Sequence, residues 1–432
     1  MSVTVGMWGV AVLIVLLIAR FPVALALISV SFGGITLLVG IKPALGIVMN
    51  TPYSFVASWT MSAVPMFLLM GFISYHAGLT TGLFEAAKVV LRRIPGGLAI
   101  SSIFACSGFA AVSGSSLATA AAMGRIAIPE MVAAGYRPSI AAGSIAAGGT
   151  IGALIPPSIL MIIYGILAET SVTQVFVGGF AIGILTALSY IIVVLLISFA
   201  RPDLIPRHVP EEGETSFGAL FKIWPMVVLV VLVFGGLFSG YFSATEAGAV
   251  GALGAVILGF ITGRLNWDAI QKSLLETVLT TSSLFIIAVG AAMFTRFLGL
   301  TGVSSFLSST VAGSDLSYFQ LMLIIVLIYL ALGTFMEPFG AMLVTLPVFL
   351  PILQAEQISL VWFGVLVVKL LEIGMITPPV GLNVFVIRNV ASQYVTVVQI
   401  FKGVIPFLIA DLFVVALVIA VPGIVLFLPQ LM

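Results

Sequence analysis

The chain carries IGALIPP at residues 151–157 and, 222 positions later, IGMITPP at residues 373–379. Each copy lies inside a long apolar stretch, where a double proline interrupts what would otherwise be a membrane helix. Because proline has no N–H, each pair leaves two carbonyls without their helical partners, and such a carbonyl facing lipid costs several kcal/mol. These carbonyls belong to Gly152, Ala153, Gly374 and Met375. We therefore expect both breaks to face protein, water or an ion, as at transporter binding sites.

The composition is that of an integral membrane protein. Of the 432 residues, 61% are hydrophobic and only 7% are charged, whereas soluble domains carry roughly 25% charged residues. The single cysteine, Cys106, excludes a disulfide framework, and the two histidines are too far apart in the sequence for a histidine-rich metal site. The sequence also has no phosphate-binding lysine loop. We therefore expect neither an enzyme nor a protein that ATP drives directly.

Apolar runs long enough to cross a bilayer predict an all-α polytopic protein. Two stretches, 97–131 and 318–354, are too long for one span and are interrupted by SGSS at 113–116 and GTFMEP at 333–338. Each is predicted to be a re-entrant hairpin, with two short full spans as the alternative. The first apolar run has no basic segment before it and is expected to be a retained span. The predicted single spans lie near 5–20, 22–40, 58–78, 139–166, 175–200, 223–240, 242–263, 273–295, 359–387 and 404–429.

The offset of 222 residues extends into the hairpins, because Pro129 and Pro351 are separated by the same distance. Two repeats are predicted, 58–168 and 275–390, and each consists of a hairpin followed by a broken helix. The broken helices cover 136–168 and 358–390. The remaining segments, 1–57, 169–274 and 391–432, are expected to form a scaffold that includes a flexible cytoplasmic connector at 201–217.

The distribution of lysine and arginine predicts the orientation, because these residues favour the cytoplasmic side. With both termini in the periplasm, only Lys42 and Arg296 fall outside. The hairpins then enter from opposite faces, and the two repeats are inverted. The residues predicted to lie inside are Arg20, Lys88, Arg92, Arg93, Arg125, Arg137, Arg201, Arg207, Lys222, Arg264, Lys272, Arg388 and Lys402.

The hairpin tips and the breaks indicate the chemistry of the site. Carbonyl and hydroxyl oxygens suit Na⁺, and the new helix N-termini suit an anion. The first tip, residues 113–119, has more hydroxyl groups than N-capping of one helix would use. At the second tip, Glu337 is an ion or substrate ligand, a protonatable group or a structural acceptor for backbone N–H groups.

Other ionisable residues also fall in apolar stretches. Lys369 and Glu372 are three residues apart on one helix face and are expected to pair. Asp411 and Glu276 are expected near an interface or a domain contact, and His76 near the end of a span.

Four motifs in the same order make the chain similar to a known family. They are SGSSLATAAAMGRIAIPEM at 113–131, GTIGALIPPS at 149–158, GTFMEPFGAMLVTLPVFLP at 333–351 and EIGMITPPVGLNVFVI at 372–387. Over essentially its whole length the chain resembles the large membrane subunit of the tripartite ATP-independent periplasmic (TRAP) transporters. The resemblance implies a sodium-driven elevator in the bacterial inner membrane, in which a domain of hairpins and broken helices moves against a scaffold.

The resemblance also implies substrates, partners and site residues. Substrates in the family are organic acids, including C4-dicarboxylates and sialic acids, and Na⁺ is the coupling ion. The partners are a small four-helix membrane subunit, expected here as a separate polypeptide, and a periplasmic substrate-binding protein. A single-component sodium/anion symporter of the same superfamily is the alternative. A passive channel or a structural membrane subunit is an alternative from another functional class.

The site residues are carried over motif by motif. The first sodium site would use Ser113, Gly152, Ile155 and Pro157. The second sodium site would use Gly333, Gly374, Thr377 and Val380. The substrate would lie near Ser115, Ser116, Thr119 and Asn383.

Overall fold

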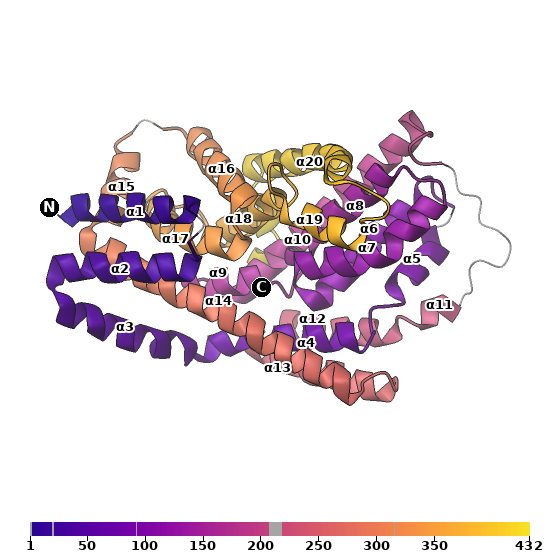
Figure 1. The fold of residues 1–432 in the computed structure, drawn as a ribbon, viewed down its shortest axis with the longest axis horizontal. Coiled ribbons are helices and arrows are strands. Elements are labelled where there is room, and N and C mark those ends of the chain that lie inside the picture. Colours follow the sequence, from indigo (N-terminus) through magenta and orange to yellow (C-terminus); the bar gives the residue numbers. More distant parts are fainter. Residues whose placement is uncertain (1, 20, 92, 207–217, 315) are drawn as a thin grey trace.

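The computed structural model describes residues 2–19, 21–91, 93–206, 218–314 and 316–432, and every regular element in these ranges is a helix (Figure 1). Most of the predicted connector, residues 207–217, lies outside the described residues, as do Arg20, Arg92 and Arg207 of the orientation argument.

Six helices of the described chain are long and apolar enough to cross a membrane, as expected for a polytopic membrane protein. The longest, α14, has 35 residues and is therefore about 52 Å long. It runs diagonally along the molecule in Figure 1 and exceeds the ~30 Å hydrocarbon thickness, so in a bilayer it is tilted or extends beyond the hydrocarbon core. The six are α10 (Val172–Ala200), α13 (Ala244–Ile261), α14 (Trp267–Thr301), α16 (Tyr318–Phe335), α17 (Pro338–Ala355) and α20 (Val397–Ala420).

The N-terminal region contains a helix that the sequence did not predict, α3 (Ile41–Val56). It is followed by the short η1 (Trp59–Ser62) and by α4 (Ala63–His76), and together they form one bent pair with an angle of 59°. The predicted span 58–78 corresponds to η1 and α4, and α3 precedes it across the bend. Lys42, Asn50 and two prolines hide the helical pattern of α3 in the sequence.

Interruptions are present at all four predicted places. Because α16 and α17 are each long and apolar enough to cross a membrane, the re-entrant course of the second hairpin stays a prediction. The first hairpin is α6 (Gly97–Ser113) and α7 (Ser116–Ala133), and the second is α16 and α17. The first broken helix is α8 (Pro138–Thr150), η2 (Ile151–Ala153) and α9 (Ile159–Leu167), and the second is α18 (Leu360–Gly374) and α19 (Leu382–Val390). The remaining helices are α1 (Ser2–Ile18), α2 (Val23–Val39), α5 (Leu83–Leu91), α11 (Gly218–Phe221), α12 (Trp224–Phe238), α15 (Val303–Ala312), α21 (Gly423–Leu426) and η3 (Pro429–Leu431).

Side-chain caps determine where many of these helices begin. A serine, threonine or asparagine immediately before the helix accepts a hydrogen bond from a backbone N–H in the first turn. Full capping boxes start α13, α16 and α20. One of these boxes is formed by Ser243 and Glu246, so the carboxylate of Glu246 has a local structural partner.

The apolar interior is divided into two cores. The first core contains buried residues of α2, α4, α9, α14, α16, α17 and α18, and the second contains those of α6, α7, α8 and α19. The first broken helix begins in the second core and ends in the first, whereas the second broken helix runs in the opposite sense. The two double-proline breaks therefore mark the places where the chain crosses between the cores.

Helices α8 and α20 approach each other through glycine. A side chain placed on Gly143 would collide with the backbone of Gly403, and one placed on Gly403 would collide with the carbonyl of Ser139. The backbones of the two helices are therefore in direct contact, as is common where membrane helices pack through small residues.

Candidate functional site

The two hairpin tips and the two breaks meet at one cavity of about 640 Å³. The first tip contributes residues 113–118 and the second contributes residues 337–339. Ala153 and Met375 bring the two breaks to the same cavity, and residues of α4 and α14 form its remaining wall. Four motifs that are spread over more than half of the sequence are thus neighbours in space.

The charged side chains that line this cavity are all carboxylates. Among the described residues they are Glu276, Glu337 and Glu372, and no lysine, arginine or histidine of the described chain joins them. His76 lies outside the lining but approaches Glu276, with 3.2 Å between its Nε2 and the carboxylate. Because like charges repel one another, an organic anion beside these three carboxylates requires cations or protons that offset the repulsion.

Glu337 is exposed at the cavity, directly before α17. Its carboxylate is directed at the N–H groups of Phe339 and Gly340 but forms no full N-cap hydrogen bond. These N–H groups support the structural interpretation of this residue, because a helix N-terminus favours a negative charge. Its exposure also leaves the carboxylate accessible to a ligand.

The first tip is held by its own serines and by the opposite half of the molecule. Ser115 caps α7 by accepting a hydrogen bond from the N–H of Ala118 at 3.4 Å. Ser116 donates to the carboxylate of Glu372 at 2.6 Å. Gly114 has φ +59° and lies against the carbonyl of Pro157, so a side chain fits there neither conformationally nor sterically. The tip of the first hairpin therefore contacts both broken helices.

The first break is tightly packed against this tip. The N–H groups of Leu154 and Ile155 both donate to the carbonyl of Ile151. The following prolines cannot donate, so the carbonyls of Gly152 and Ala153 have no helical donor, as predicted. A Cβ on Gly152 would lie 2.8 Å from both the carbonyl oxygen of Ser115 and Oγ1 of Thr119.

The second break differs from the prediction. The N–H of Thr377 donates to the carbonyl of Gly374 at 3.1 Å, and the N–H of Asn383 donates to that of Met375 at 3.0 Å. The expectation that both carbonyls are free is therefore wrong. The reason is local: the chain makes a tight turn after α18, and the first turn of α19 folds back over the break.

The hydroxyl-bearing and glycine residues of the predicted first sodium site form one group in space, to which Ile155 could contribute only its backbone carbonyl. Ser113 and Thr119 place their hydroxyl oxygens 3.2 Å apart, next to Gly152 and the carbonyl of Pro157. The side chain of Ile155 points away toward Gly183 of α10. Thr119 was predicted at the substrate, but the structure places it in this group and outside the cavity lining.

The predicted second sodium site is built on a contact between two glycines. Gly333 of the second hairpin and Gly374 of α18 touch backbone to backbone. Thr377 donates its hydroxyl hydrogen to the carbonyl of Ile373 at 2.6 Å, which leaves its oxygen lone pairs available. Val380 is half-buried and lies beyond the double proline, in the turn before α19.

Of the predicted substrate residues, Ser115 and Ser116 line the cavity and Asn383 does not. Asn383 is fully buried, and its amide nitrogen donates to the carbonyl of Ala146 at 3.4 Å. Its Oδ1 has no hydrogen-bond partner within the described chain. Asn383 therefore connects the second broken helix to the first half of the first broken helix.

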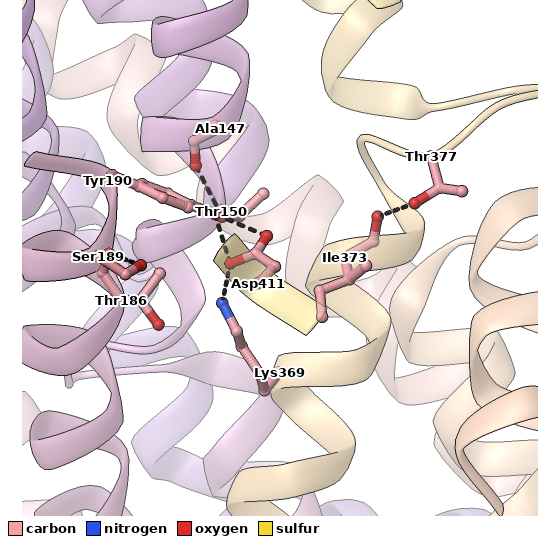
Figure 2. Close-up of polar contacts among 9 residues, drawn as sticks. All are labelled: Ala147, Thr150, Thr186, Ser189, Tyr190, Lys369, Ile373, Thr377 and Asp411. Carbon is pink, nitrogen blue, oxygen red and sulfur yellow. Dashed lines mark hydrogen bonds and ion pairs between the residues drawn. The ribbon is translucent and has the colours of Figure 1, made fainter. Parts of the chain in front are cut away.

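A buried charge network links the two broken helices through the helices beside them. Lys369 of α18 forms an ion pair with Asp411 of α20. Tyr190 of α10 donates to the same carboxylate at 2.8 Å, and its hydroxyl lies 3.1 Å from that of Thr150 at the end of α8 (Figure 2). The network thus extends from the residue before the first break to the helix before the second.

The predicted pair of Lys369 and Glu372 is wrong. The cation of Lys369 is bound to Asp411, and Glu372 accepts from Ser116 instead. Spacing along one helix showed that the two side chains share a face, but it could not reveal a stronger partner on another helix. The roles of Asp411 and Tyr190 in this network were not found from the sequence for the same reason.

Comparison with known proteins gives a consistent result. The family model described as "Tripartite ATP-independent periplasmic transporter, DctM component" matches residues 10–424. The chain is 35% identical over 374 residues to the C4-dicarboxylate TRAP transporter large permease protein DctM of Pseudomonas aeruginosa, with 86% of each chain covered. It is 31% identical over 418 residues to the sialic acid TRAP transporter large permease protein SiaM of Vibrio cholerae, with 96% of each covered.

A solved structure shares the fold at low sequence identity. The YdaH transporter of Alcanivorax borkumensis superposes with a TM-score of 0.62 at 15% identity, over 88% of this chain and 89% of that one. This likeness concerns the arrangement of the helices alone.

Proposed function

Because the chain belongs to the DctM family of tripartite ATP-independent periplasmic transporters, we propose that it takes up an organic acid anion by sodium-coupled secondary transport. Its relatives are named as large permeases for C4-dicarboxylates and for sialic acid. Relatives of this kind are transporter permeases rather than enzymes, which supports a transport role without chemistry on the substrate.

One observation carries the proposal of cation coupling. The cavity at the meeting point of the tips and the breaks is lined mostly by apolar side chains, and its polar side chains are carboxylates and hydroxyl groups, with no cationic side chain of the described residues. An organic anion bound there faces repulsion that cations bound nearby would offset. Na⁺ suits this task, because the surrounding oxygens of the tips and breaks are the hard ligands that it prefers.

The proposed sodium sites follow the two groups of residues. The first uses Ser113, Gly152, Ile155 and Pro157, to which the hydroxyl of Thr119 is added by its position. The second uses Gly333, Gly374, Thr377 and Val380. Ser115 and Ser116 then face the substrate between the tips. Asn383 lies outside the cavity lining and supports the site through its hydrogen bond to the carbonyl of Ala146.

The proposed mechanism is an elevator built on inverted repeats. The opposite sense in which the two broken helices cross between the cores supports an inverted relation of residues 58–168 and 275–390. We assign the two hairpins and broken helices to the moving part and segments 1–57, 169–274 and 391–432 to the scaffold. Both termini are assigned to the periplasm of a bacterium whose inner membrane holds the protein.

The family also supports two partners. In a tripartite transporter the large permease works with a small permease subunit and a periplasmic substrate-binding protein. We propose that the periplasmic protein delivers the anion and performs most of the selection, which leaves the identity of the organic acid to that partner.

Transport in proteoliposomes tests the proposal. The chain is reconstituted with a small permease subunit and a periplasmic binding protein, and uptake of radiolabelled succinate and of N-acetylneuraminic acid is measured. We expect uptake of one of them only with an inward Na⁺ gradient, and uptake unchanged when K⁺ replaces Na⁺ would overturn the coupling. Robust uptake by this chain alone would favour a single-component symporter, and a sodium-independent conductance would favour a passive channel.

The membrane potential separates two stoichiometries. Two Na⁺ with a dianion move no net charge, whereas two Na⁺ with a monoanion move one charge, worth about 2.3 kcal/mol per 100 mV. An imposed inside-negative potential should therefore accelerate uptake of the monoanion and leave uptake of the dianion unchanged.

A further inference from the structure

Helices α8, α10 and α20 pack against one another (Figure 1). A second cavity, of about 660 Å³, is lined by residues at or near their ends. It shares no lining residue with the cavity between the hairpin tips. Each helix contributes one cation at or near its end: Arg137 directly before α8, Arg201 directly after α10 and Lys402 in the second turn of α20. The transport mechanism uses none of these three side chains.

The three cations form no ion pair with an acidic side chain of the described residues. No aspartate or glutamate of the described residues lines this cavity. By contrast, Lys88 and Lys272 are paired with carboxylates, each at 2.6 Å. Three positive charges around one space, with no acid among its described lining residues, favour an anionic ligand.

The remaining lining has the character of a lipid site. Ser139 adds a hydroxyl group next to the cations, and the start of α8 adds the positive end of a helix dipole. Leu196, Ile197 and Pro406 form an apolar flank, and Leu196 is 62% exposed on the outer face of α10. A molecule with an anionic head and an apolar tail matches this arrangement of charge beside exposed apolar surface.

We propose that this cavity binds a phosphate-bearing anion, and that in the membrane the ligand is the headgroup of an anionic phospholipid such as phosphatidylglycerol. Basic pockets between helices on the cytoplasmic side are suited to such headgroups, and the distribution of lysine and arginine assigns all three cations to that side. The acyl chains then lie along the exposed face of α10.

A lipid bound in this cavity would also stabilise the first broken helix. Helix α8 is its first half, and α8 already touches the backbone of α20 at Gly143 and Gly403. A headgroup that binds Arg137, Arg201 and Lys402 together connects α8 and α20 to α10. The lipid therefore stabilises the arrangement that holds the first break in place, whichever substrate the protein carries.

Thermal unfolding of the purified protein in detergent tests the site. Phosphatidylglycerol, phosphatidylcholine and inorganic phosphate are added separately to the native chain and to the triple variant Arg137→Gln/Arg201→Gln/Lys402→Gln. The matched control, Arg93→Gln/Lys222→Gln/Lys272→Gln, also removes three positive charges but none from this cavity. We expect phosphatidylglycerol to raise the unfolding temperature of the native chain and of the control, and phosphatidylcholine to have no effect.

For the triple variant we expect binding of phosphatidylglycerol to be weaker by about 100-fold, since each cation near an anionic lipid contributes roughly 1 kcal/mol. An equal rise in all three proteins would overturn the proposal. If inorganic phosphate alone gives the full rise and prevents a further effect of the lipid, the ligand is free phosphate and the lipid assignment is wrong. If the triple variant cannot be purified, Arg201→Gln is examined by native mass spectrometry, and an unchanged number of retained phosphatidylglycerol molecules would again overturn the site.

Discussion

Pro156 and Pro157 are buried, whereas Pro378 and Pro379, at the same place in the second copy of the phrase, are exposed. The first break is packed between the tip of its hairpin and α10, and its freed carbonyls keep no helical donor. The second break touches its hairpin through two glycines, and its carbonyls accept hydrogen bonds from Thr377 and Asn383. Nearly the same seven residues thus form a buried break in one half. In the other half they form an exposed break whose carbonyls accept hydrogen bonds from the chain itself.

This difference between the two breaks shows that the prolines determine only which carbonyls lose their helical donors. What the carbonyls then face depends on the next turn of chain and on the hairpin that packs against it. An enclosed site holds its oxygens in place before an ion arrives, whereas an open site must give up internal hydrogen bonds to bind one. We therefore expect the two proposed sodium sites to differ in affinity, with the second more sensitive to substitutions.

The largest expected effect is on the network that joins the two breaks. Lys369→Met leaves the buried carboxylate of Asp411 without its cation and should lower the free energy of unfolding by about 3–5 kcal/mol. Thermal unfolding in detergent measures the loss. The double variant Lys369→Met/Asp411→Asn should recover most of it, and Lys272→Met, which breaks an exposed pair with Asp268, should cost at most about 1 kcal/mol. Equal losses in Lys369→Met and Lys272→Met would show that the buried network does not connect the halves.

The next effect concerns the contact between the first tip and the second broken helix. Ser116→Ala removes the hydroxyl that donates to Glu372 and should cost about 1–3 kcal/mol, because a buried acceptor is left without its donor. Ser101→Ala is a matched control on the same hairpin, since the hydroxyl of Ser101 is buried without a partner and its removal should be neutral. Chemical denaturation compares the two variants, and a neutral Ser116→Ala would contradict the contact.

A loss of stability no larger than this is expected at the glycine contact of the second site. A Cβ on Gly374 would collide with the backbone of Gly333, so Gly374→Ala should cost about 1–3 kcal/mol by overpacking and should reduce sodium-dependent uptake. Gly299→Ala on α14 meets open space and should be neutral or slightly stabilising. If Gly374→Ala retains full uptake with normal sodium dependence, the glycine contact is not part of the second site.

The smallest expected effect is on the sodium dependence of uptake, and it tests each of the two proposed sodium sites separately. Thr377→Ala removes one proposed oxygen ligand, and the Na⁺ concentration for half-maximal uptake should rise roughly fivefold, in line with about 1 kcal/mol for one polar contact. Thr377→Ser retains the hydroxyl and should restore the native value. Thr119→Ala should have a comparable effect only if the first site also binds Na⁺, and unchanged sodium dependence in both threonine variants would remove both residues from the sites.

Local sequence features predicted the breaks and tips, because proline and a polar interruption act on the helix that contains them. The meeting of Ser116 with Glu372 was beyond the sequence, since a contact over 256 residues depends on how the two halves pack. The same limit explains the wrong pair of Lys369 and Glu372. Helix α3 was missed because its prolines and Asn50 mask an apolar pattern that the packing against α2 and α14 supports.

The site residues also differ in how far the sequence alone could place them. Gly152 and Gly374 followed from counting back from the prolines, and the structure places both against a hairpin. Thr119 could not be separated from Ser115 and Ser116 by sequence, because one helical turn decides which hydroxyl faces the cavity and which faces the break.

The contact of Gly143 with Gly403 has a mechanical consequence. Side chains can change rotamers to let one helix slide past another, but two backbones in direct contact have nothing to rearrange. We therefore expect α8 and α20 to move together, because Gly143 and Ser139 of α8 both lie directly against the backbone of Gly403. If α8 moves through the membrane, residues 397–420 are expected to move with it, and α20 then belongs to the moving part rather than to the scaffold to which segment 391–432 was assigned. A disulfide cross-link engineered between α8 and α20 would then leave transport intact.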